Sequence, residues 1–85
     1  MHEIVLSAPA ERDLKRLPAA IFHRVIAAIR ALAGNPRPPG CRKPRGSGRD
    51  DYRIRAGDYR VLYEVDDTAR IVRIMRVRHR REVYR

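Results

Sequence analysis

Arginines alternate along one short stretch of this sequence in a way that suits the binding of phosphate. The segment Asp51–Val65 has the pattern of two β-strands joined by a tight turn, in which Gly57 supplies the positive φ that such a turn needs. Successive side chains of a strand point to opposite faces, so Arg53 and Arg55 share one face, whereas Tyr52 and Ile54 share the other. With Arg60 on the second strand, the hairpin presents several guanidinium groups, planar donors that hold a phosphate in a fixed geometry.

Such a cluster suits the cleavage of RNA without a metal ion. RNA carries its own nucleophile, the 2′-hydroxyl, so a protein need only align it with the adjacent phosphate, stabilise the charge of the transition state and manage two protons. Guanidinium groups would stabilise the charge, and a histidine or tyrosine would serve the proton steps. We expect His79, Arg80 and Tyr84 to converge on the face of the hairpin arginines. Taken singly, each arginine is equally well explained as a solvated surface charge.

Other kinds of site find little support in the sequence. The three histidines, His2, His23 and His79, are scattered and have no partner at metal-ligand spacing. Cys41 is the single cysteine, which excludes an intramolecular disulfide and a cysteine-rich zinc site. No glycine-rich phosphate loop precedes a helix. We therefore expect no metal and no cofactor.

The composition predicts one small domain, residues 1–85, with an anionic partner. Lysine and arginine number 20 against 10 acidic residues, a net charge of +10 in 85 residues. A polyanion, either nucleic acid or a strongly acidic protein, is the first partner to expect. Codon bias towards arginine explains why only Lys15 and Lys43 are lysines, but it explains the excess of positive charge less well. No apolar run approaches the length of a membrane span or a signal-peptide core, so we expect a cytoplasmic protein without membrane contact.

Three elements are expected before the hairpin. The apolar run within residues 2–6 predicts a short buried strand. Ser7 is a suitable N-cap for a first helix, which runs to Leu17, where Pro18 imposes a bend. Residues 18–33 repeat apolar side chains at three- and four-residue spacing and predict a second helix with one buried stripe, with Gly34 as its C-terminal cap.

A loop rich in proline, glycine and basic residues, 35–49, separates the second helix from the hairpin. It is either a solvated connector or a basic lip beside the hairpin, able to touch a phosphate backbone. The residues that would contact RNA in the loop and in the C-terminal tail are Arg42, Lys43, Arg45, Arg49, Arg78 and Arg81.

The last part of the chain completes the predicted fold. Residues 66–69 form a turn, and residues 71–77 form a strand with apolar groups on both faces, which indicates a central strand. The fold class is therefore α+β: an N-terminal strand, two helices, then a C-terminal three-strand antiparallel meander. The helices would lie on one face of the sheet and the hairpin arginines on the open face.

The sequence resembles a known toxin family over essentially its whole length. The pattern from Tyr52 to Tyr63, then Val77-Arg78-His79-Arg80 and the closing Val83-Tyr84, is similar to the RelE branch of the RelE/ParE toxins. The resemblance implies a RelE-like fold and a toxin of a type II toxin–antitoxin system. It also implies a metal-independent mRNA endonuclease that cuts in the ribosomal A site and leaves a 2′,3′-cyclic phosphate and a 5′-hydroxyl. The implied partners are a cognate RelB-like antitoxin, the ribosome and mRNA.

The resemblance also implies roles for individual residues. Arg53 and Arg55 match two basic strand residues of the family. Arg60 matches the arginine that contacts the scissile phosphate, and Arg80 matches a second arginine that contacts a phosphate. Tyr84 matches a tyrosine that orients or deprotonates the 2′-hydroxyl. Family members commonly carry lysine at the first two positions. Arginine does not lose its proton in proteins, so these two residues are expected to stabilise charge. Proton abstraction would then fall to Tyr84 or to the nearby histidine, His79.

Two other functions are compatible with the same residues. ParE-like toxins, which poison DNA gyrase and are not nucleases, share the hairpin pattern, and the arginine cluster with Tyr84 is the feature that such poisons do not need. The other possibility is a basic RNA-binding module without catalysis, which would bind in a salt-sensitive manner and not cleave.

Overall fold

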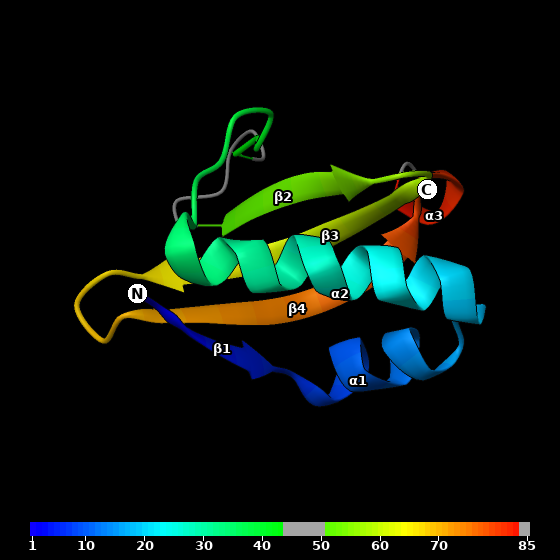
Figure 1. The fold of residues 1–85 in the computed structure, drawn as a ribbon, viewed down its shortest axis with the longest axis horizontal. Coiled ribbons are helices and arrows are strands. Elements are labelled where there is room, and N and C mark those ends of the chain that lie inside the picture. Colours follow the sequence, from blue (N-terminus) through cyan, green and yellow to red (C-terminus); the bar gives the residue numbers. More distant parts are fainter. Residues whose placement is uncertain (44–50, 84–85) are drawn as a thin grey trace.

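A four-stranded sheet with one long helix across its face forms the body of the protein in a computed structural model, which describes residues 1–43 and 51–83 (Figure 1). The described elements are, in chain order, β1 (Glu3–Leu6), α1 (Ala8–Lys15), α2 (Ala19–Gly34), β2 (Asp51–Ala56), β3 (Tyr59–Asp66), β4 (Ile71–His79) and α3 (Arg80–Val83). The predicted α+β class and element order are confirmed, and the short helix α3 was not predicted. No helix among these residues is both long and apolar enough to cross a membrane.

The strand order in the sheet is β1-β4-β3-β2. The last three strands of the chain form the predicted antiparallel meander, whereas β1 pairs with β4 in parallel. β4 is therefore flanked by a strand on each side, as its apolar residues on both faces predicted. It continues to His79, two residues beyond the predicted end, because Arg78 and His79 still pair with β3.

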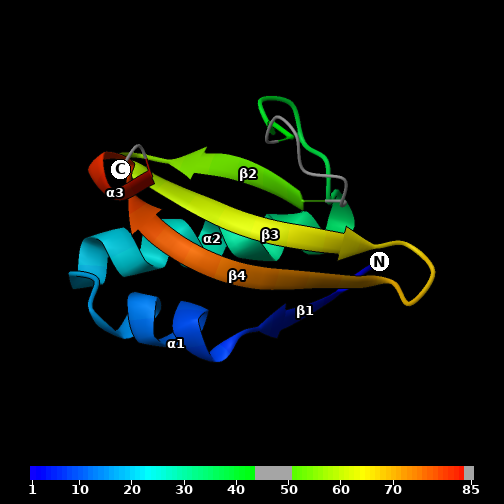
Figure 2. The ribbon, with the colours of Figure 1, turned by 180° about the vertical axis from the view of Figure 1, so that it is seen from behind.

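The two longer helices occupy different positions. α2 crosses one face of the sheet, and the opposite face carries no helix along most of its length (Figures 1 and 2). α1 follows directly from β1 and lies beside β4 rather than over the centre of the sheet (Figure 2). The hairpin arginines are thus left on an open face, as predicted.

The helix ends differ slightly from the predicted ones. The Ser7 hydroxyl accepts a hydrogen bond from the Ala10 amide at 3.1 Å and is the predicted N-cap of α1. α1 ends two residues before Leu17. Gly34 is the last residue of α2 rather than its cap, because the Asn35 amide still donates to the Ala31 carbonyl and holds the final turn.

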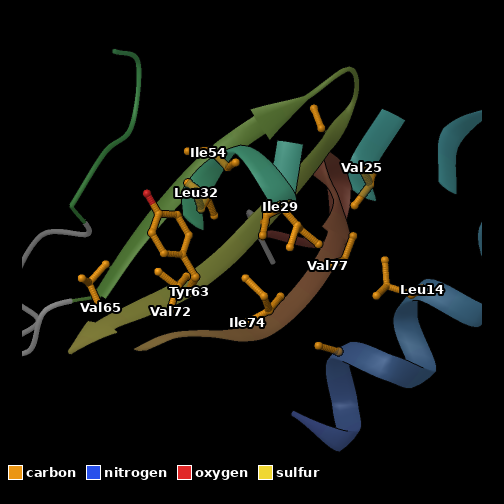
Figure 3. Close-up of a cluster of buried hydrophobic side chains, with 13 residues drawn as sticks. Leu14, Val25, Ile29, Leu32, Ile54, Tyr63, Val65, Val72, Ile74 and Val77 are labelled. Carbon is orange, nitrogen blue, oxygen red and sulfur yellow. The ribbon is translucent and has the colours of Figure 1, made fainter. Parts of the chain in front are cut away.

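The core lies between α2, α1 and the sheet (Figure 3). Among the residues that the structure describes, it contains 13 buried apolar or aromatic residues, which come from α1 and α2 and from β2, β3 and β4. Tyr63 is 1% exposed, and its hydroxyl donates a 2.7 Å hydrogen bond to the Pro36 carbonyl. Burial raises the pKa of this phenol, so it stays protonated and fastens the loop after α2 to the sheet.

Candidate functional site

A basic groove lies on the open face of the sheet, between the loop after α2 and strands β2 and β3. It has a volume of about 360 Å³. Its lining contains four arginines, and the full set is Gly40, Arg42, Arg53, Ile54, Arg55 and Arg60. The three hairpin arginines predicted to lie together on one face therefore do so.

The pairing of the strands aligns three arginines across the sheet. Arg55 of β2 lies opposite Arg60 of β3, and Arg60 lies opposite Arg78 of β4. Directly opposed residues in antiparallel strands point to the same face, and neighbouring strands lie ~4.8 Å apart. Arg55, Arg60 and Arg78 thus form a line of cationic groups across three strands, called here the arginine row.

Arg60 occupies the centre of the arginine row and is 9% exposed, the one buried charged residue among those described. A charge that is largely removed from water interacts with a neighbouring anion more strongly than an exposed charge does. This position makes Arg60 the strongest candidate for contact with a phosphate that enters the groove.

The wall of the groove is a segment of loop that pairs with the edge of the sheet. The Arg42 amide donates to the Arg53 carbonyl at 2.9 Å, and the Arg53 amide donates to the Arg42 carbonyl at 2.8 Å. Gly40 precedes this bridge with φ at +89°, a conformation that other residues adopt at a cost. Arg42 therefore lies beside the hairpin, and its contact with a phosphate backbone stays a prediction.

The other basic loop residues predicted to contact RNA are not described as part of the groove lining. Lys43 is exposed and does not line the basic groove. Arg45 and Arg49 lie outside the described residues.

A cluster of polar side chains holds the loop in place. Arg37 donates to both carboxylate oxygens of Asp67, at 2.9 and 3.3 Å, and to the Tyr52 hydroxyl at 3.0 Å. The guanidinium also lies 5.1 Å from the centre of the Tyr52 ring, and His2 reaches Asp67 at 3.2 Å. The hydrogen bonds from Arg37 and His2 lower the pKa of Asp67. Asp67 was predicted only as part of a turn, and this cluster was not predicted, because its members are far apart in the chain.

His79 is not on the face of the arginine row, which corrects the prediction that it converges there. It pairs with Tyr59, and both lie on the side of the sheet that faces α2. The two rings meet edge to face at 5.3 Å, and the His79 Nδ1 accepts the Arg81 amide at 3.3 Å. The reason is the extension of β4 to His79, since alternation then sends Arg78 to the open face and His79 to the other.

The remaining tail residues are placed as follows. Arg80 begins α3, and its amide donates to the Asp58 carbonyl at 2.8 Å. The side chains of Arg80 and Arg81 are exposed. Tyr84 lies outside the described residues. Arg78, predicted only as an RNA contact, thus holds the position beside Arg60 that was expected of Arg80.

Asp13 connects α1 to the end of β4. Its carboxylate accepts hydrogen bonds from Arg76 at 2.8 and 3.1 Å and from the Val77 amide at 2.9 Å. Burial alone would raise its pKa, but these bonds and the charges of Arg76 and Arg78 outweigh burial, so the pKa of Asp13 is lowered. Asp13 therefore stays ionised and orders this end of the strand.

The groove can bind a phosphodiester and stabilise added negative charge, but its lining has no group suited to proton transfer near neutral pH. Its titratable side chains are arginines, which do not act as bases. Across residues 1–43 and 51–83, no group of three or more histidine, cysteine or acidic side chains is arranged to hold a metal ion.

Comparison with known proteins gives consistent similarities. Residues 4–84 match the model of the family described as ParE toxin of type II toxin-antitoxin system, parDE. The chain is 36% identical to Toxin RelG of Mycobacterium tuberculosis over 86 residues, which cover 99% of this chain and 97% of that protein. It is similar to the toxin in the crystal structure of the toxin-antitoxin complex RelBE2 from the same organism, with a TM-score of 0.81, 30% identity, and coverage of 92% of this chain and 96% of that chain. It is also similar to a chain of the archaeal RelE-RelB complex from Pyrococcus horikoshii, with a TM-score of 0.82 and 29% identity. The match covers 93% of this chain and 94% of that chain.

Proposed function

Because this chain belongs to the RelE/ParE superfamily of toxins from type II toxin–antitoxin systems, we propose that it is an endoribonuclease that cuts mRNA in the ribosomal A site. The arginine row beside Arg42 and Arg53 carries the proposal. A row of guanidinium groups on an open face matches the charge of a phosphodiester and is not required for packing the core.

The proposed reaction uses the nucleophile that RNA itself supplies. The 2′-oxygen attacks the adjacent phosphorus as its proton passes to a base. The bond from phosphorus to the 5′-oxygen then breaks, and that oxygen takes up a proton. The products are a 2′,3′-cyclic phosphate and a 5′-hydroxyl, so neither a metal nor an external nucleophile is needed.

The arginines act on charge in this scheme. Preorganised donors aimed at the charge of a transition state supply a large share of many rate enhancements, and loss of one such donor costs ~10²–10³ in rate. Arg60 is assigned to the scissile phosphate, with Arg55 and Arg78 on either side of it. Arg53 and Arg42 hold the flanking backbone.

Tyr84 is assigned to the proton step at the 2′-hydroxyl, as the family resemblance implies. His79 receives no proton step, because it lies on the other side of the sheet from Arg60. Arg78 takes the second phosphate role that the resemblance gave to Arg80, because it lies opposite Arg60 in the strand pairing.

We also propose the partners that this function requires. The similar solved structures from M. tuberculosis and P. horikoshii are toxin–antitoxin and RelE-RelB complexes. A cognate RelB-like antitoxin would bind this chain and restrain it in the cytoplasm. The ribosome and its mRNA would be the target of the free toxin, consistent with a net charge of +10.

Mapping of mRNA 5′ ends shortly after induction from a tight promoter tests the proposal. The wild type should produce new ends within translated frames, and Arg60→Ala should not. Arg30→Ala is the matched control, because Arg30 is exposed on α2, away from the groove, and should leave the cuts intact.

A second candidate function is supported by the match to the ParE toxin family. A gyrase poison would arrest growth with intact mRNA and accumulated double-strand DNA breaks. That result in the same experiment would replace the nuclease assignment.

A further inference from the structure

The open face of the sheet changes the sign of its charge along strand β2. Side chains alternate along a strand, so Asp51, Arg53 and Arg55 all point to this face. Arg53 and Arg55 line the basic groove, and Asp51 is the next residue of β2 on the same face. Because the chain rises ~3.3 Å per residue, Asp51 lies only ~7 Å along the strand from Arg53. The basic groove is thus followed directly by an acid.

The neighbouring strand shows the same change of sign. Glu64 of β3 lies directly opposite Asp51, on the face away from the buried side chains of Tyr63 and Val65. On its other side Glu64 lies opposite Arg73 of β4, which offsets one of the two carboxylates. Asp51, Glu64 and Arg73 therefore form a second row across three strands, called here the acidic row, with one carboxylate in excess.

Two carboxylates directly opposite each other are unfavourable for the stability of a sheet. The Cβ atoms of such a pair lie ~4.5–5.5 Å apart, and like charges at this separation destabilise the strands. Among the side chains that the structure describes, no ion pair involves the carboxylate of Asp51 or Glu64. Stabilisation of the fold therefore does not explain this pair, whereas its position beside the basic groove indicates an effect on the ligand of that groove.

Acidic side chains continue beyond the acidic row, towards the turn between β3 and β4. A hollow of about 450 Å³ lies there, with Glu64, Asp66 and Asp67 in its lining, and Arg73 is the one basic residue among the described residues that line it. Figure 2 shows this turn at the opposite end of the sheet from α3. A phosphate backbone that ran along the strands from the groove would meet these acids.

The positions of the groove and the acidic row favour one direction for a bound RNA strand. Phosphates are attracted at the groove and repelled at the acidic row. The ~7 Å between Arg53 and Asp51 is within the Debye length of ~8 Å at physiological ionic strength, so salt does not abolish the repulsion. The favourable path for a polyanion therefore crosses the strands at the groove and does not follow them towards the turn.

We propose that the acidic row ends the RNA-binding surface, so that the RNA strand crosses the sheet at the basic groove and few of its phosphates are bound. Asp51 and Glu64 are in this assignment specificity-determining residues, which act on the RNA backbone by repulsion and take no part in the proton steps. The inference rests on the proposed endonuclease function and defines one boundary of its substrate site.

Binding of non-cleavable RNA to the full chain tests this boundary. The probes are 2′-O-methyl RNAs of three and nine nucleotides, titrated by fluorescence anisotropy over a series of KCl concentrations. The double variant Asp51→Asn, Glu64→Gln keeps the shapes of both side chains and removes their charges. It should bind the nonanucleotide several-fold more tightly and change the affinity of the trinucleotide little. The slope of log K against log salt for the nonanucleotide should steepen by ~0.7, because the cation of Arg73 can then meet one more phosphate.

The double variant Glu3→Gln, Glu11→Gln is the matched control, because it changes the net charge by the same amount. Both residues are exposed, on β1 and α1, and neither lines the basic groove. The control should produce the same small gain in affinity for both probes. A nonanucleotide gain in Asp51→Asn, Glu64→Gln no larger than that of the control, or an equal gain for both lengths of RNA, would overturn the proposal.

Thermal unfolding of Asp51→Asn, Glu64→Gln separates this electrostatic role from a structural one. Loss of a like-charge pair should leave the Tm unchanged or raise it. A Tm several degrees below that of the wild type would overturn the proposal, because the carboxylates would then be needed to hold the strands together. Absence of mRNA cuts by the wild type, or full cleavage by Arg60→Ala, would instead refute the endonuclease function, and the comparison of RNA lengths would still show where the binding surface ends.

Discussion

At the scale of single residues, the proposed activity depends on the shape of guanidinium groups as much as on their charge. Arg60 is 9% exposed and lies between two other arginines of the row. Its planar fork can hold two phosphate oxygens at once, which a lysine ammonium cannot do in the same geometry. Charge alone is therefore not expected to sustain the reaction.

Arg60→Lys tests this point because it preserves the charge. We expect the single-turnover rate of mRNA cleavage on ribosomes to fall by ~10² or more, the magnitude typical of the loss of one preorganised donor. Arg30→Lys on the outer face of α2 is the control and should cleave at the wild-type rate. A wild-type rate in Arg60→Lys would show that a point charge is sufficient at this position.

At the scale of elements, Asp13 fixes α1 against the end of β4. The carboxylate side chain is 11% exposed and receives three hydrogen bonds, from the Arg76 guanidinium and the Val77 amide. Its pKa is lowered in the folded protein. A lowered folded pKa contributes stability above the unfolded value, and this contribution is lost as the pH falls through the folded value.

Asp13→Asn should therefore reduce the free energy of unfolding at pH 7 by ~1–3 kcal/mol, the usual cost of losing hydrogen bonds to a charged group. The difference from wild type should shrink as the pH falls below about 4, where the unfolded carboxyl begins to protonate. Urea unfolding between pH 7 and pH 3 measures it. Asp58→Asn, at the exposed hairpin turn, is the control. A difference that is constant with pH would contradict the charged role of Asp13.

The loop that bears Arg42 is a second element held by specific contacts. Arg37 connects it to Asp67 and Tyr52, and the Tyr63 hydroxyl connects it to the buried side of the sheet. These contacts position the backbone that pairs with Arg53. The groove wall is thus held by residues that do not line it.

Arg37→Ala should loosen this wall. We expect faster hydrogen exchange at the amides of Arg42 and Arg53, which hydrogen-bond to each other's carbonyls, and weaker binding of RNA. Mass spectrometry of hydrogen exchange measures the first effect. Exchange at the core strand β4 should be unchanged, and unchanged exchange at Arg42 would show that the Arg37 contacts do not hold the loop.

At the scale of the whole molecule, the charge balance dominates the electrostatics. Lysine and arginine outnumber acidic residues by 20 to 10. Salt screens both the attraction within ion pairs and the repulsion among cations. Because the net charge is +10, the screening of repulsion has the larger effect on stability. The folded protein should therefore gain stability when salt is added.

Thermal unfolding at low and high KCl tests this expectation. The Tm should rise between 50 mM and 500 mM KCl by ~2–6 °C, which corresponds to roughly 0.5–1 kcal/mol for a domain of this size. A Tm that falls with KCl would mean that ion pairs such as Arg76–Asp13 outweigh the net repulsion.

Local patterns in the sequence were sufficient to predict several of these features. The alternation in β2 placed Arg53 and Arg55 on the face opposite Ile54, and Ser7 was identified as the N-cap of α1. The apolar residues on both faces of β4 indicated a central strand. Each of these depends on residues within a few positions of one another, where the period of a strand or the geometry of a cap fixes the outcome.

Tertiary structure decided what local pattern could not. The basic tail carries no apolar alternation, so only its pairing with β3 shows that β4 continues and sends Arg78 and His79 to opposite faces. The bridge between Arg42 and Arg53 and the contact between Arg37 and Asp67 join segments that are distant in sequence. The sequence therefore determined which side chains carry the charge and which elements bear them. Which of these charges meet was decided by strand register and loop packing, because both depend on contacts between segments that no local period encodes.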